Sequence, residues 1–155
     1  MTVRLMTEQD LNDASLVHQA AFVRQQDSYE WLKCTHNAFP RMLCYLIEFE
    51  GNIVGYIVWA QKSGFRPQAV IELEQLAVHP DYQGKGLGQT LIKDSLELVK
   101  SQLHKQGSTV KHILVNTRED NHAQSLYRKV LGAEVEATIK DLYSANEVFM
   151  IARNV

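Results

Sequence analysis

Hydrophobic residues recur along the chain with two periods, and each period predicts a different kind of element. Alternating or unbroken runs of Ile, Val, Leu and Tyr predict strands. These runs cover residues 2–7, two halves of 42–61 that part at the sequence EGN, and 69–78, 111–117, 134–143 and 146–154. A spacing of three to four residues predicts helices over 10–25, 28–39, 87–107 and 120–132.

The order of these elements defines the fold class. It runs β-α-α-β-β-β-α-β-α-β-β, with Pro40, Pro80, Gly107 and Gly132 at element ends. Strand pairs joined by short turns alternate with helices, so we expect an α/β protein with a mixed, mostly antiparallel sheet flanked by helices. No linker, repeat or low-complexity stretch divides residues 1–155, which predicts a single domain.

Composition narrows the classes of partner. The chain is 45% hydrophobic and 22% charged with a formal net charge of -2, so no basic stripe favours nucleic acid or a membrane surface. No apolar run approaches the length of a membrane span, and the N-terminus lacks a signal pattern. We therefore expect a cytoplasmic protein. The scattered His and Cys residues lack ligand spacing, so no metal is expected.

The stretch HPDYQGKGLGQTLIK, residues 79–93, places three glycines just where a helix must begin. A helix N-terminus presents unpaired N–H groups and partial positive charge, and glycines allow a ligand close to that backbone. Lys85 adds a cation there. Gln89 breaks the dinucleotide fingerprint, and no Lys-Ser/Thr pair follows as a P-loop requires. The turn predicts an anion site of another kind.

Two segments resemble the GNAT superfamily of acyl-CoA N-acyltransferases. The residues Gln83, Gly84, Lys85, Gly86, Leu87 and Gly88 match its Q/R-x-x-G-x-G/A segment. NHAQSLYRKVLGAEV, residues 121–135, is similar to its N-x-x-A-x-x-L-Y-x-x-x-G-F block. The resemblance implies a splayed sheet that holds acetyl-CoA, with pyrophosphate on the amides of residues 83–88. It also implies that the pantetheine arm pairs with the backbone of Leu76, Ala77 and Val78.

The resemblance further implies an N-acetyltransferase that joins acetyl-CoA and a primary amine in a ternary complex. Tyr127 occupies the position of the general acid, which protonates the departing thiolate. Strand alternation puts Glu72 and Glu74 on one face, and both match base positions in the family. Glu74 is the favoured general base, with Glu72 as the alternative.

The sequence suggests two possible roles for Asn121. It can cap the helix over 120–132 with Gln124 three residues on, or it can contact coenzyme A as an Asn near this position does in the family. The family's usual register places that Asn at Asp120 instead.

The sequence does not specify which amine is the acceptor or whether the protein forms an oligomer. A small-molecule or peptide amine would be shaped by the helices over 10–39 and the loop 62–68. A homodimer is compatible with the resemblance. The alternative function is a non-catalytic module of the same fold that senses acyl-CoA, which thiol release in the presence of amines would distinguish.

Overall fold

The computed structural model describes residues 1–155 and has a seven-stranded sheet in the order β1-β2-β3-β4-β5-β7-β6. The chain forms two compact units: Met1–Ala60 with Gln75–Val99, and Gln61–Glu74 with Lys100–Val155. The fourth strand, β4 (Gln68–Val78), belongs to both units. The mixed sheet with flanking helices confirms the predicted fold class.

The first unit is a sheet with helices on both faces. Its strands are β1 (Thr2–Leu5), β2 (Met42–Phe49) and β3 (Asn52–Gln61), and β2 pairs antiparallel with both neighbours. The β2–β3 turn has positive φ at Glu50 and Gly51, the geometry of a tight two-residue hairpin. The hairpin predicted at this sequence is therefore confirmed.

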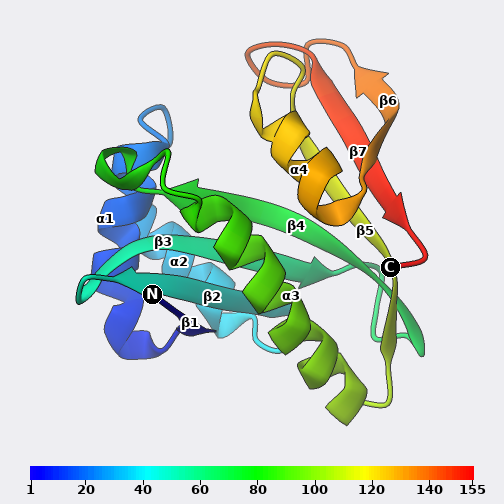
Figure 1. The fold of residues 1–155 in the computed structure, drawn as a ribbon, viewed down its shortest axis with the longest axis horizontal. Coiled ribbons are helices and arrows are strands. Elements are labelled where there is room, and N and C mark those ends of the chain that lie inside the picture. Colours follow the sequence, from blue (N-terminus) through cyan, green and yellow to red (C-terminus); the bar gives the residue numbers. More distant parts are fainter. The chain divides into compact units, whose positions relative to one another are not determined.

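Helices α1 (Leu11–Ala21) and α2 (Ser28–Asn37) lie behind these strands in Figure 1, and α3 (Leu87–Lys105) crosses in front. Successive side chains of β3 point to opposite faces of the sheet, so the strand contributes to the packing on both. Tyr56 and Val58 join the core formed with α1 and α2, whereas Trp59 donates a hydrogen bond to Ser95 Oγ of α3 at 2.8 Å. The apolar face of α3 is buried, as the spacing of its hydrophobic residues predicts, and consists of Leu91, Ile92, Leu96, Val99 and Leu103.

The second unit is built on β5 (Thr109–Arg118), which pairs antiparallel with β7 (Glu147–Arg153). The edge strand β6 (Glu134–Ile139) pairs with β7 and is exposed along its whole length. Helix α4 (Ala123–Leu131) packs beside β5 (Figure 1). The parallel register between β4 and β5 runs from Gln68 to Glu72 and stops there, although both strands continue.

Three predicted boundaries are wrong by several residues. Helix α1 ends at Ala21 rather than 25 because Phe22 leaves the helical region with ψ of 69°. Helix α4 starts at Ala123 rather than 120, after a turn in which the Asn121 amide donates to the Arg118 carbonyl. Strand β6 ends at Ile139, where pairing with β7 ends, rather than at 143.

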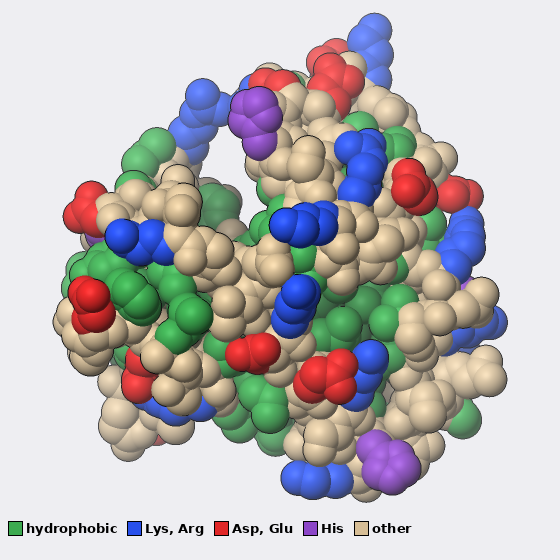
Figure 2. All heavy atoms as spheres, viewed as in Figure 1, with side chains coloured by type: hydrophobic (Ala, Val, Ile, Leu, Met, Phe, Trp, Pro, Cys, Tyr) green, Lys and Arg blue, Asp and Glu red, His purple; other side chains and the backbone are tan.

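Charged side chains of both signs are interspersed over the face seen in Figure 2, and neither sign gathers into a patch there. No helix combines the length and the apolar character needed to cross a membrane.

Candidate active site

The turn before α3 is shaped by left-handed backbone. Gly84 and Gly86 have φ of 78° and 77°, a conformation that side chains disfavour. A Cβ at either position would meet nothing within 4 Å, so the backbone faces open space. Gly88 differs, because it lies inside the first turn of α3 and is not among the positive-φ glycines. The three glycines therefore do not share a single role.

The same turn presents a series of unpaired N–H groups. The amides of Gly84, Lys85 and Gly86 donate no hydrogen bond, and the Thr90 amide is the first to bond back into the turn, to the Gly86 carbonyl at 3.1 Å. The amides of the first helical turn also lack partners by geometry. The exposed Lys85 has no ion pair, whereas Leu87 is buried and anchors the helix start. This arrangement suits an anion.

The end of β4 carries the residues expected to pair with pantetheine. Leu76 and Val78 are half-buried and Ala77 is buried. All three lie beyond Glu72, the last residue of β4 in register with β5. The Gln83 side-chain amide donates to the Val78 carbonyl at 3.1 Å, which ties the glycine turn to the strand. No local pattern in the sequence indicates this contact.

Tyr127 lies on α4 with its ring buried and only 6% of the residue exposed. Its hydroxyl makes no hydrogen bond, yet it is not among the fully buried unpaired atoms, so the oxygen keeps contact with solvent. Burial raises the pKa of Tyr127 to about 12. A buried tyrosine usually finds a partner for its hydroxyl, so an unpaired donor here is suited to a ligand.

The two candidate bases have different surroundings in the structure. Glu72 is half-buried, and Lys62 Nζ lies 3.1 Å from its Oε2, so this carboxylate already has a cation. Glu74 is exposed, two residues further along β4 and beyond the pairing with β5. Both alternate with the buried residues Ile71 and Leu73, as strand periodicity predicts.

Asn121 has a local structural role. Its Oδ1 accepts a hydrogen bond from the Ala123 amide at 2.8 Å at the start of α4. The side chain of Gln124 does not form the reciprocal bond of a capping box. Its Nε2 donates to the backbone carbonyls of Arg118 and Glu119 instead. Asp120, the alternative in register, is exposed, and the hydrogen bond from Arg118 lowers the pKa of its carboxyl.

Sequence reasoning missed one polar pair in the second unit. Glu147 at the start of β7 is only 4% exposed, and its Oε2 accepts a hydrogen bond from Asn116 Nδ2 at 2.7 Å. The two residues are 31 positions apart, so no local pattern could indicate the contact. No group of three or more His, Cys, Asp or Glu side chains is arranged to hold a metal.

The comparisons with known proteins agree with this geometry. The sequence model described as the acetyltransferase (GNAT) family matches residues 9–133, which include both the glycine turn and Tyr127. A Bacillus subtilis protein provisionally named as a ribosomal protein bS18-alanine N-acetyltransferase is 26% identical over 148 residues, 93% of this chain and 87% of the relative.

Two solved structures share the fold. The ribosomal-protein-S18-alanine N-acetyltransferase of Escherichia coli has a TM-score of 0.75 at 22% identity, over 99% of this chain and 93% of that one. An aminoglycoside 6'-N-acetyltransferase complexed with coenzyme A has a TM-score of 0.79 at 12% identity, over 100% and 98%. The chain belongs to the GNAT family of acetyltransferases. It is an acyl-CoA-dependent acetyltransferase.

Proposed function

We propose that this protein transfers an acetyl group from acetyl-CoA to a primary amine by direct attack in a ternary complex. Tyr127 is the general acid and Glu74 is the general base. The observation that carries the proposal is the Tyr127 hydroxyl, an unpaired donor on a buried ring within the segment that matches the family. We favour Glu74 over Glu72 because it lies beyond the last residue of β4 paired with β5 and two residues before Leu76, and Glu72 is the alternative.

In this proposal, acetyl-CoA binds in the first unit, along the glycine-containing turn at residues 83–88 and the end of β4 at residues 76–78. The pyrophosphate accepts hydrogen bonds from the amides of residues 83–88, three of which have no partner in the protein. Lys85 supplies the opposite charge. The pantetheine arm pairs with the backbone of Leu76, Ala77 and Val78 as an added strand would. Asn121 adds a contact to coenzyme A through its Nδ2, because only its Oδ1 is bonded at the start of α4.

Each bond and proton in the proposed acetyl transfer has a defined origin and destination. The amine lone pair attacks the thioester carbonyl carbon, and the C–S bond breaks as the tetrahedral intermediate collapses. The departing sulfur takes a proton from Tyr127, and the proton that the amine loses passes to Glu74 through water. The products are the acetylated amine and coenzyme A.

The acceptor decides how much the base contributes. A lysine-like amine of pKa about 10.4 must lose its proton at a cost of roughly 4.6 kcal/mol at pH 7, whereas an α-amino group of pKa about 8 needs about 1.4 kcal/mol. The name of the Bacillus subtilis relative makes a peptide N-terminus the first acceptor to test. A diamine is the comparison with higher pKa.

The test is thiol release from acetyl-CoA in the presence of an alanyl peptide, a diamine and an alcohol as a control lacking the amine. We expect saturable release with at least one amine and acetylation of that amine by mass spectrometry. Coenzyme A binding by calorimetry without release for any amine would instead support the acyl-CoA sensor. Thermal stability unchanged by coenzyme A would contradict both functions.

A further inference from the structure

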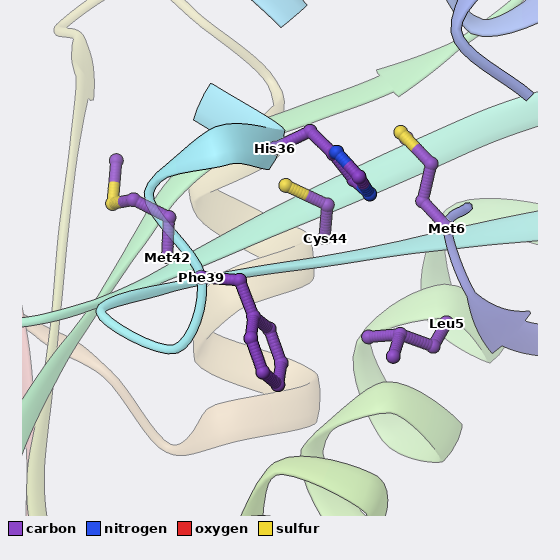
Figure 3. Close-up of a pocket in the computed structure, with 6 residues that line it drawn as sticks. All are labelled: Leu5, Met6, His36, Phe39, Met42 and Cys44. Carbon is purple, nitrogen blue, oxygen red and sulfur yellow. The ribbon is translucent and has the colours of Figure 1, made fainter. Parts of the chain in front are cut away.

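The first unit contains an apolar cavity of about 220 Å³, shown in Figure 3. Its lining consists of Leu5, Met6, His36, Phe39, Met42 and Cys44. No Lys, Arg, Asp or Glu is among these residues, and the Nδ1 atom of His36 is fully buried. This lining selects no particular ligand. A polar group that a ligand can reach lies elsewhere in the same unit, on β4.

The side chain of Gln75 on β4 is held in place from two other elements. Its Oε1 accepts a hydrogen bond from Trp31 Nε1 of α2 at 3.1 Å and another from the Tyr56 hydroxyl of β3 at 2.7 Å. An indole nitrogen only donates, so the amide atom that faces Trp31 is the oxygen. The Nε2 end makes no hydrogen bond and is not fully buried, so it keeps contact with solvent.

This arrangement orients the free N–H groups of Gln75 before a ligand arrives. A glutamine without partners rotates freely, and a ligand that binds it must immobilise the side chain. The two hydrogen bonds to Oε1 already restrict Gln75. Trp31 is 44% exposed and adds apolar surface nearby. The pair is therefore suited to a ligand that carries an oxygen acceptor beside an apolar group.

The position of Gln75 relates it to the proposed acetyl-CoA site. In that proposal the pyrophosphate lies at residues 83–88 and the pantetheine arm runs back along β4 from Val78 to Leu76, so the thioester lies toward Gln75. The arm extends the sheet in its own plane. The Gln75 side chain instead points toward α2, on the face of the sheet opposite α3 (Figure 1). A group that meets Nε2 on this face belongs to the acceptor amine.

We propose that Gln75 is a specificity-determining residue, whose Nε2 donates to the backbone carbonyl next to the reacting amine of a peptide acceptor. This inference rests on the proposed acetyl transfer and names its substrate class as a peptide N-terminus. An alkyl diamine offers no acceptor atom there, because its second nitrogen is protonated at neutral pH and only donates. It therefore leaves Gln75 Nε2 unpaired.

The proposed hydrogen bond is observable without turnover. Coenzyme A carries no acetyl group, so a complex of the full-length chain with coenzyme A holds a peptide without acetylating it. The side-chain amide signal of Gln75 is followed by heteronuclear NMR and identified by its absence in Gln75→Met. Alanylalanine amide should shift this signal saturably, whereas diaminobutane should not. A signal that stays unmoved with the peptide in large excess would overturn the inference and leave the proposed acetyl transfer intact.

Gln75→Glu separates the donor from the contacts that hold it. One carboxylate oxygen still accepts from Trp31 and Tyr56, while the other cannot donate and repels a carbonyl oxygen. The kcat/KM for alanylalanine amide should fall by roughly tenfold, mainly through KM, and that for diaminobutane should not fall. Gln106→Glu is the control, because Gln106 is exposed and lies just beyond the end of α3, and it should keep the ratio of the parent.

Two kinetic results would contradict the role of Gln75. An equal loss for both amines in Gln75→Glu would place the contact on acetyl-CoA, and an unchanged ratio would remove the contact altogether. If Gln75→Glu fails to fold, the amide signal of the parent protein still decides. Turnover of neither amine by the parent would contradict the proposed function, whereas the peptide-dependent shift tests the contact of Gln75 by itself.

Discussion

At the scale of single residues, burial has two opposite effects on Tyr127. It raises the pKa to about 12, so the phenol stays protonated at neutral pH and is available as a donor. It also makes the phenol a weaker acid than in water, relative to a thiol of pKa about 8.5. Tyr127 therefore assists the reaction through its hydrogen bond to the departing sulfur, which strengthens as negative charge develops there. Transfer of the proton is not favourable before the C–S bond begins to break.

Tyr127→Phe removes the hydroxyl and keeps the ring, so acetyl-CoA affinity should survive while turnover falls by roughly 10²–10⁴-fold. Tyr143→Phe is the control, because Tyr143 is 73% exposed and outside the proposed site. In the parent, the ionisation of Tyr127 should produce no loss of rate below about pH 10, since the pKa is raised toward 12. Turnover equal to the parent, measured where chemistry limits the rate, would exclude Tyr127 as the acid.

Glu74→Gln should lower turnover most near neutral pH, and the loss should shrink as rising pH supplies neutral amine from solution. An amine of high pKa should be affected more than a peptide N-terminus, by the difference in deprotonation cost given above. Glu72→Gln is the matched comparison on the same strand. It should leave the pH profile parallel to the parent and cost less than about 1 kcal/mol of stability, because only a partly exposed ion pair with Lys62 is lost.

The opposite pattern, with convergence at high pH in Glu72→Gln alone, would transfer the role to Glu72. Parallel profiles in both variants would mean that the amine arrives neutral and needs no carboxylate as base.

At the scale of elements, Arg4 of β1 ties together the first turn of the chain and β2. Its guanidinium donates to both oxygens of Asp10, at 2.7 and 2.9 Å, and to Glu48 of β2. The hydrogen bond from Arg4 is the largest cause that lowers the pKa of Asp10 to about 2, and the amide and hydroxyl of Thr7 add to it. Asp10 is therefore charged in the folded protein throughout the neutral range.

Asp10→Asn should lower the free energy of unfolding by about 1–2 kcal/mol at pH 7, after allowance for the exposure of Arg4. The pKa of Asp10 is lowered on folding, so its contribution is complete above about pH 4 and disappears as the pH falls through 2. Denaturation as a function of pH should show the two curves converging below about pH 3. Asp13→Asn, an exposed residue on α1, is the control, and a difference that is undiminished at pH 2 would refute this account.

The glycine turn and the β2–β3 hairpin provide a matched test of ligand contact against backbone strain. Gly86 and Gly51 have φ of 77° and 80°, and a Cβ at either would meet no protein atom within 4 Å. Gly86→Ala and Gly51→Ala should each cost about 1 kcal/mol of stability from left-handed strain. Only Gly86→Ala should weaken coenzyme A binding, by roughly tenfold or more, because the added methyl group occupies the space through which the phosphate approaches the backbone amides. Equal affinity in both variants by calorimetry would remove the turn from the site.

Local patterns predicted the elements well because each depends on residues close in sequence. The apolar face of α3, the hairpin at Glu50-Gly51 and the strand alternation around Glu72 all have the predicted form. Boundaries were less accurate where a single backbone angle decides them, as at Phe22 after α1. The spacing of apolar residues can continue beyond the residue where the backbone leaves the helical conformation, so the spacing alone does not indicate where the helix ends.

At the scale of the whole molecule, side-chain contacts between distant segments were beyond the sequence. The pairing of Asn116 with Glu147 and the buried His36 Nδ1 arise only when separate elements pack together. Nothing near either residue in sequence indicates its surroundings. The ion pair between Lys62 and Glu72 is likewise seen only in the folded structure. Sequence motifs indicate the candidate site, and packing determines the surroundings of its residues.

The interrupted pairing of β4 makes a prediction for ligand binding along the sheet. Residues 68–72 of β4 are already paired with β5, whereas Leu76, Ala77 and Val78 lie beyond the last registered pair. Acetyl-CoA should therefore slow hydrogen exchange in peptides covering 75–79, by up to roughly 100-fold at 100 times the dissociation constant, and leave 68–72 nearly unchanged. The exposed edge strand β6 serves as the control, because an unpaired edge alone should gain no protection. Unchanged exchange over 75–79, in a sample that calorimetry shows to be saturated with acetyl-CoA, would mean that the pantetheine arm does not extend the sheet at β4.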